Sequence, residues 1–175
     1  MGVLVTKEEF NLRSKLNDLD YGVVPLEKMP AGSIIQYNYD TGPGSHFTTT
    51  STSFVNLSYS VSISPRFANS LMLIELSALG QQPNTTTGVS CVTIYRNNTT
   101  NLGDSTSLYG MSATGEFAST GGVYVTAPQT FFVYDEPKTR EAVSYHLWGR
   151  TTSSGTAYCT HNSVTRTLSV KEIRQ

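Results

Sequence analysis

The feature that most constrains the fold of this chain is an alternation of apolar and polar side chains with a period of two residues. Within residues 55–63, every odd-numbered position is apolar and every even-numbered position is asparagine or serine. Successive side chains of a β-strand point to opposite faces of a sheet, so this pattern predicts a strand with one buried and one solvated face. The chain must therefore bury at least one sheet face.

Further segments have the composition of short strands, and turn-rich stretches separate them. We expect strands at residues 34–39, 55–63, 71–79, 89–95, 123–126, 130–134, 142–148, 157–161 and 165–173. Glycine, proline, asparagine and serine gather between them at residues 41–44, 80–88, 97–104, 115–122, 135–140 and 151–155. Eight or nine short strands with no helix among them predict an all-β, antiparallel β-sandwich of jelly-roll type over residues 30–175.

Residues 1–29 differ from this pattern and are expected to form an N-terminal arm. Thr6 followed by Glu9 has the form of a capping box, and a helix is predicted over residues 7–19. A helix of this length is marginal alone, so it needs an apolar surface to pack on. That surface is either its own sandwich or another subunit or larger assembly. The candidate anchoring residues share one apolar stripe: Phe10, Leu12, Leu16 and Leu19.

Composition argues against several classes of partner. Only 14% of the residues are charged and the formal net charge is −1, whereas 45 of the 175 residues are serine or threonine. Such a chain has no net positive field for nucleic acid or anionic lipid. Its apolar runs are far shorter than the roughly 20 residues that cross a bilayer. We expect neither nucleic-acid binding nor membrane insertion.

No catalytic constellation is evident. The chain has three histidines and no G-x-S-x-G, P-loop or dinucleotide-binding motif. Cys159 and His161 share a strand face, but two ligands do not make a zinc site, and Cys91 and Cys159 are expected to be buried small apolar residues. Asp135 and Glu136 precede a proline and are interpreted as a solvated turn. We therefore expect no enzyme, no metal and no cofactor.

Aromatic residues make up 10% of the chain and occur mostly in strand patterns. Tyr59, Phe132 and Trp148 are interpreted as core or inter-subunit packing rather than as a sugar platform. Loops around Asn84, Asn97 and Asn98 expose amides and hydroxyls, which makes them possible binding loops for a glycan, although ordinary solvated loops have the same composition. Few Lys or Glu residues protect the strand edges, so side-by-side association into a closed oligomer is expected.

Four motifs also occur in a fixed order along the chain. Three are P-A-G-S-I-I-Q at residues 30–36, F-V-Y-D-E-P at 132–137 followed by Tyr145, and T-L-S-V-K-E-I at 167–173. The fourth, I-S-P at 63–65 followed by N-S-L-M-L-I at 69–74, lies between the first two.

Together these motifs resemble a family of bacteriophage virion proteins, structural or tail-fibre-like, with a β-sandwich domain. The resemblance implies a homotrimer on the virion surface that binds or reinforces without chemistry. With only about 30 residues before the sandwich, we expect a capsid decoration protein or short fibre whose N-terminal arm contacts other virion proteins of the capsid or tail. The alternative is a receptor-binding tip domain for a host surface glycan. A small viral coat protein is less favoured because its arm is usually basic.

Overall fold

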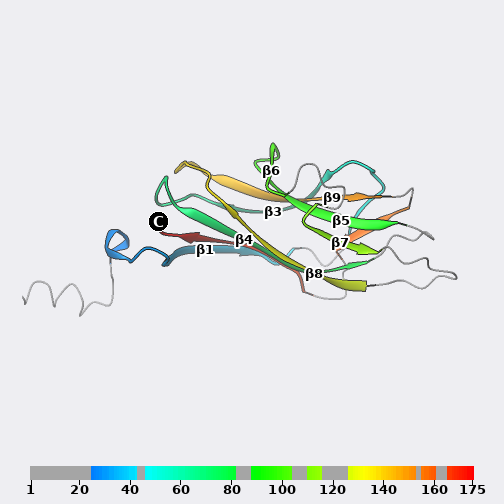
Figure 1. Ribbon diagram of the computed structural model, residues 1–175, viewed down its shortest axis with the longest axis horizontal. Coiled ribbons are helices and arrows are strands. Elements are labelled where there is room, and N and C mark those ends of the chain that lie inside the picture. The colour runs from blue at the N-terminus through cyan, green and yellow to red at the C-terminus, as the bar shows by residue number, and fades with distance from the viewer. Residues whose placement is uncertain are drawn as a thin grey trace, which may run out of the picture.

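The computed structural model describes residues 25–42, 46–81, 88–103, 110–115, 126–152, 155–160 and 165–175, and these residues form two antiparallel sheets packed in two layers (Figure 1). A single 3-10 turn, η1 (Leu26–Lys28), precedes the strands. Sheet A consists of β1 (Ile34–Asp40), β2 (Phe47–Thr49), β4 (Leu71–Gln81), β8 (Thr126–Asp135), β10 (Ala157–Thr160) and β11 (Thr167–Ile173). Sheet B consists of β3 (Val55–Ile63), β5 (Val89–Arg96), β6 (Thr100–Asn101), β7 (Ser112–Gly115) and β9 (Val143–Thr151).

The pairing of these strands is that of a jelly roll. Pairs form from the two ends of the chain inward: β1 with β11, β3 with β9, β4 with β8, and β5 with β7. This is the pattern of one long hairpin, and rolling it up places alternate pairs in opposite sheets. Strands β1 and β2 lie end to end, as do β11 and β10, so each sheet is about four strands wide. The expected all-β jelly-roll sandwich is confirmed.

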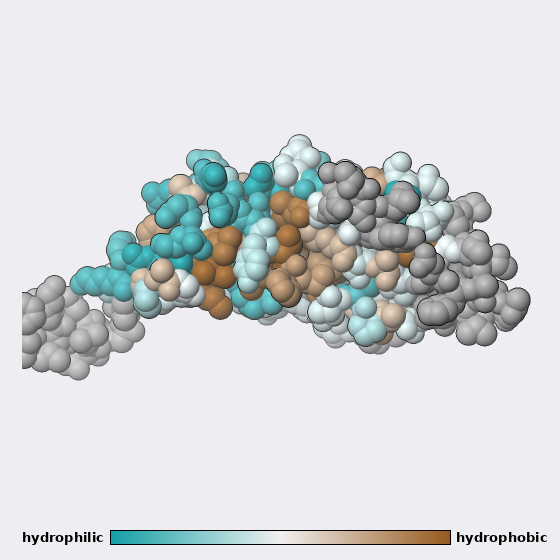
Figure 2. Space-filling view, in the orientation of Figure 1, coloured by the Kyte–Doolittle hydropathy of each residue, from teal (hydrophilic) through white to brown (hydrophobic). Residues whose placement is uncertain are grey.

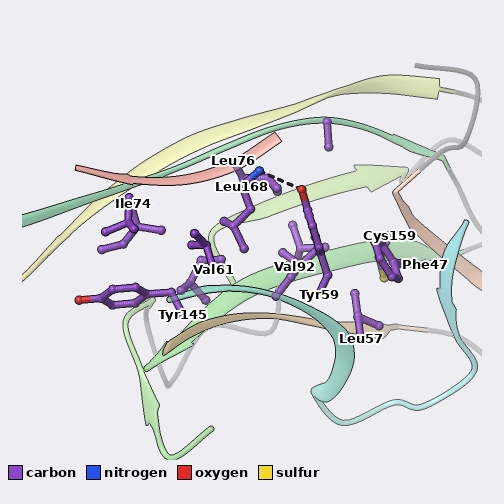
Figure 3. Close-up of a cluster of buried hydrophobic side chains, with 14 of the residues drawn as sticks. Phe47, Leu57, Tyr59, Val61, Ile74, Leu76, Val92, Tyr145, Cys159 and Leu168 are labelled. Atoms are coloured by element: carbon purple, nitrogen blue, oxygen red, sulfur yellow. Dashed lines mark hydrogen bonds between the residues drawn. The ribbon is translucent and has the colours of Figure 1, made fainter. Parts of the chain in front are cut away.

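The alternation seen in the sequence accounts for the interior. Leu57, Tyr59, Val61 and Ile63 of β3 are buried, and the same two-residue burial pattern runs along β9 and β4. The buried side chains of both sheets form one hydrophobic cluster between the layers (Figure 3). Cys91 and Cys159 have no exposed surface, as expected.

Tyr59 links the two layers. Its hydroxyl, at the end of a side chain from β3, donates a hydrogen bond to the backbone oxygen of Asp40 in β1 (2.5 Å). The Tyr59 hydroxyl oxygen also accepts a hydrogen bond from the backbone N–H of Leu168 in β11 (3.0 Å; Figure 3). The Tyr59 ring stacks on the Phe47 ring. Tyr59 is 1% exposed, and burial is the main reason that its pKa rises to about 12.

A buried carboxylate fixes the corner between β3 and β4. Glu172 of β11 has no exposed surface, and its Oε1 accepts hydrogen bonds from the backbone N–H groups of Arg66 and Phe67 and from the Ser70 hydroxyl. Of the three donors, the Ser70 hydroxyl is buried and would otherwise lack this acceptor. Glu172, the glutamate of the T-L-S-V-K-E-I motif, therefore has a structural role.

The C-terminal strand also holds the segment that precedes β1. Backbone hydrogen bonds join Gly32 and Ser33 to Arg174, and the Arg174 guanidinium donates to the carbonyl oxygens of Leu26 and Met29. Residues 25–29 are thus attached to the end of the sandwich from which β1 starts. The predicted helix at residues 7–19 and its candidate anchoring residues, Phe10, Leu12, Leu16 and Leu19, lie outside the described residues.

Several strand predictions differ from the structure. β8 begins at Thr126, four residues before the predicted 130–134, and contains Pro128, which an edge strand tolerates. β2 and β7 were not predicted, and β6 lies within the segment expected to be a turn, because a two- to four-residue strand has too few positions to show an alternation. Residues 123–125 and 161 lie outside the described part of the chain.

Candidate interaction surface

Large apolar side chains are exposed on the outer face of sheet A. Ile34, Tyr37 and Tyr39 of β1 and Phe132 and Tyr134 of β8 are each more than half exposed. Every exposed large hydrophobic residue found in the described segments belongs to these two strands. At about 100 Å² each, they expose roughly 500 Å² in total, divided between the two strands.

The register of the sheet places these residues in two rows that run across the strands. One row is Tyr37, Lys171, Leu73 and Tyr134, and the next is Tyr39, Ser169, Glu75 and Phe132. The aromatic residues therefore lie at both ends of each row, on β1 and β8, which flank β11 and β4. In the space-filling view, which looks at an edge of the sandwich, hydrophobic residues gather near the middle of the molecule (Figure 2).

An ion pair lies between the two aromatic pairs. The Lys171 ammonium is 2.5 Å from the Glu75 carboxylate, and it also lies 5.9 Å from the centre of the Tyr37 ring. Tyr37 and Tyr39 stack on each other with ring centres 5.5 Å apart, and Phe132 and Tyr134 meet edge to face at 5.9 Å. Each outer strand thus presents a pair of packed rings to solvent.

A hollow of about 250 Å³ opens on the same face. Hydroxyl groups, one carboxylate and aromatic rings surround it. Its lining residues are Glu75, Leu76, Ser77, Thr130, Phe131, Phe132, Thr167 and Ser169.

The structure narrows one expectation from the sequence and corrects another. Phe132, expected in the core or in inter-subunit packing, is 66% exposed, which excludes the core of its own subunit and leaves inter-subunit packing untested. Asp135 is buried, not a solvated turn residue: it pairs with Arg96 (2.7 Å) and accepts a hydrogen bond from the Tyr145 hydroxyl (2.9 Å). Burial, followed by the Asp135 charge, raises the pKa of Tyr145. Asp135 therefore joins β8 of sheet A to β5 and β9 of sheet B.

In sheet B, the asparagine side chains of the turn between β5 and β6 are paired with neighbouring residues. Asn97 and Asn98, two of the possible binding-loop residues, are exposed at the centre of a tight turn and both have positive φ. The Asn97 side-chain oxygen accepts from the Ser144 N–H, and that of Asn98 accepts from Asn56 and from the Trp148 indole. Trp148 itself is partly buried and stacks on Tyr95. Asn84 lies outside the described residues.

The remaining candidates add no reactive cluster. Burial is the main cause that raises the pKa of the Cys159 thiol to about 12, and His161, its possible partner as a ligand, is not among the described residues. Within the described segments, no three His, Cys, Asp or Glu side chains are placed to hold a metal ion. No described helix is long and apolar enough to cross a membrane.

The sequence contained one signal of this surface. Residues 131–134 are apolar at four consecutive positions, which is typical of a strand covered on both faces, and residues 36–40 place polar side chains between tyrosines. A scan against protein-family models and a search of curated proteins found no match to this chain.

Proposed function

We propose that this chain is a non-enzymatic surface protein of a bacteriophage virion, a homotrimer that decorates the capsid or forms a short fibre. The N-terminal arm, residues 1–29, contacts other virion proteins, and the jelly roll projects from the particle. The ordered set of motifs in residues 30–175 suggests the virion family, and the sandwich fold agrees with it.

The observation that carries the proposal is the exposed aromatic surface of sheet A. The interior of the sandwich is already filled, because the core side chains of both sheets are buried. The aromatic rings on the outer face contribute nothing to that core. Their exposure to water costs about 25 cal/mol of free energy for each Å² of apolar area. Such a surface favours a protein that is assembled in its working state.

The arm can be tested without disturbing the sandwich. Deleting residues 1–24 leaves the Arg174 contacts to Leu26 and Met29 in place, so the truncated chain should keep the β-sheet signal in circular dichroism and the unfolding midpoint of the full chain. In a phage that lacks its own copy, the full chain supplied in trans should enter purified particles and the truncated chain should not. Normal incorporation of the truncated chain, or absence of the full chain from particles, would contradict the proposal.

A receptor-binding tip for a host glycan is the second candidate, and the hollow beside Phe132 favours it. An aromatic ring can stack on a sugar, while Ser77, Thr130 and the Glu75 carboxylate offer hydrogen bonds. The isolated full chain would then bind specific glycans on an array, and Phe132→Ala would abolish that binding. Absence of glycan binding by the folded protein would count against this candidate.

A further inference from the structure

We propose that the aromatic rows of sheet A are the subunit interface of the homotrimer, with the β8 edge of each copy beside the β1 edge of the next. The outer faces of the three A sheets then point toward the threefold axis. This inference rests on the proposed homotrimer and names the surface that forms it.

The two strands concerned are open edges. Among the described strands, β1 pairs only with β11 and β8 pairs only with β4, so each has unpaired backbone groups on its other side. Monomeric proteins protect such edges with lysine, proline, inward charges or bulges. β1 has a register shift between Ile34 and Gln36 and β8 contains Pro128, but both lie outside the stretches that carry the aromatic rings. Neither strand contains lysine, and the only charged residues are Asp40 and Asp135, each at the last position of its strand.

Strand direction allows the two edges to meet. Three antiparallel steps separate β1 from β8, through β11 and β4, so the two strands run in opposite directions. A rotation about an axis parallel to the strands leaves these directions unchanged. The β8 strand of one subunit is therefore antiparallel to the β1 strand of the next, which is a pairing that sheets commonly use.

Register brings the aromatic residues together. Tyr37 and Tyr134 stand at opposite ends of one row, and Tyr39 and Phe132 stand at opposite ends of the adjacent row. The same rotation keeps each row at its level. Tyr134 then lies beside Tyr37 of the neighbouring subunit, and Phe132 beside its Tyr39. Cross-strand aromatic pairs of this kind are favourable.

The width of the sheet is suited to three copies. Four strands spaced about 4.8 Å apart form a sheet about 19 Å wide. If three such sheets form the walls of a triangular prism, each wall lies about 5.5 Å from the threefold axis. Sheets that pack face to face stand about 10 Å apart, so each lies about 5 Å from the midplane. Side chains on the three outer faces would therefore fill the space around the axis.

Area and charge are also compatible with this arrangement. Each contact covers about 400 Å² from four half-exposed rings, and the partly exposed Leu71, Leu73 and Ile173 add to it, toward the roughly 1,000 Å² of a specific interface. The Lys171–Glu75 pair faces the axis, but each charge keeps its partner within its own subunit. Neither member of this pair becomes buried without its partner.

Disulfide trapping in the full chain tests the contact directly. Tyr39 and Phe132 of one subunit are three strands apart, about 14 Å, which is too far for a disulfide, so a bond between cysteines at these positions must join two copies. The variant Tyr39→Cys/Phe132→Cys should shift from monomer to covalent dimer and trimer on a non-reducing gel after mild oxidation. The native cysteines have no exposed surface and should not contribute.

Two matched controls fix the geometry. Tyr39→Cys alone should remain monomeric on the gel because β1 does not meet β1. Tyr39→Cys/Thr126→Cys should also remain monomeric because Thr126 lies six residues along β8 from Phe132, about 20 Å away. Cross-linking of the single variant would indicate a twofold contact between β1 edges and would overturn the proposal.

Light scattering separates the possible failures. If the wild type is a trimer and the double-cysteine variant stays trimeric without cross-linking, the proposed interface is wrong but the virion proposal stands. If the wild type is a monomer, both the interface and the trimer are refuted. As a second variant, Phe132→Asp should shift the trimer to monomer with an unchanged circular dichroism spectrum, and Ala142→Asp, exposed on the β8–β9 connection, should remain trimeric.

Discussion

Replacing Tyr59 by phenylalanine tests how the two layers of the sandwich are held together. The ring would keep its stacking on Phe47, but the hydroxyl that bridges β1 and β11 would be lost. Asp40 is exposed, so water can replace the hydroxyl at its carbonyl at little cost. Leu168 has no exposed surface, and its unpaired N–H should cost about 2 kcal/mol.

This loss is measurable by urea unfolding followed through the fluorescence of Trp148, the only tryptophan. In urea, we expect a free energy of unfolding about 2 kcal/mol lower than that of the wild type. In thermal unfolding, we expect a midpoint temperature lower by about 4–8 °C. Both proteins must be compared at one concentration because association contributes to stability. Tyr158→Phe, on a partly exposed side chain of β10 outside the proposed interface, is the matched control and should change stability by less than about 0.5 kcal/mol.

The same substitution should change the dependence of stability on alkaline pH. Folding raises the pKa of Tyr59 from 10.0 to about 12, so the folded state holds this proton more tightly than the unfolded state. The resulting stabilisation is fully present below pH 10 and is lost as the pH rises through 12. Between these values, the variant should lose stability less steeply than the wild type. A loss below about 0.5 kcal/mol at neutral pH, or parallel alkaline curves, would refute this account of the bridge.

Three further perturbations follow from other buried groups. Glu172→Leu should lower the free energy of unfolding by about 3 kcal/mol because three donors lose their acceptor, and Glu172→Gln, which keeps a carbonyl oxygen, by about 1 kcal/mol; equal urea curves would contradict this. Gly149→Ala should cost about 1–3 kcal/mol because the added methyl group would lie 2.5 Å from the Cys159 sulfur, and Cys159→Ala should recover part of that loss in a double-mutant cycle. Asp135→Asn should lower the free energy of unfolding by about 1–3 kcal/mol because the buried contact to Arg96 and Tyr145 loses its charge; an unchanged urea curve would argue against the contact.

The interior of the fold could be predicted from sequence because its signal is local. Residues 55–63 alternate without exception, and the structure contains a strand with those bounds. Alternation along a strand depends only on which face meets the core. The nesting of strands from the two chain ends could not be read in this way, because it depends on pairing between segments more than 100 residues apart, such as β1 with β11.

The candidate interaction surface was harder to predict for the same reason. Phe132 looks like a core residue in sequence because three apolar neighbours surround it, and only the register shows that alternate members of the run point outward. Asp135 resembles a turn residue because Pro137 follows closely. Its burial depends on Arg96 and Tyr145, which reach the same end of the sandwich from other strands.

The attachment of residues 25–29 to Arg174 has a mechanical consequence. A pull along the axis of β1, applied to the chain ahead of Pro25, reaches the sandwich at the end where Ile34 lies opposite Ile173. The backbone hydrogen bonds between β1 and β11 then bear the force in shear, all at once, whereas a pull across the strand would break them one after another. Under the proposed attachment through residues 1–29, such a pull would load the domain in its stronger direction.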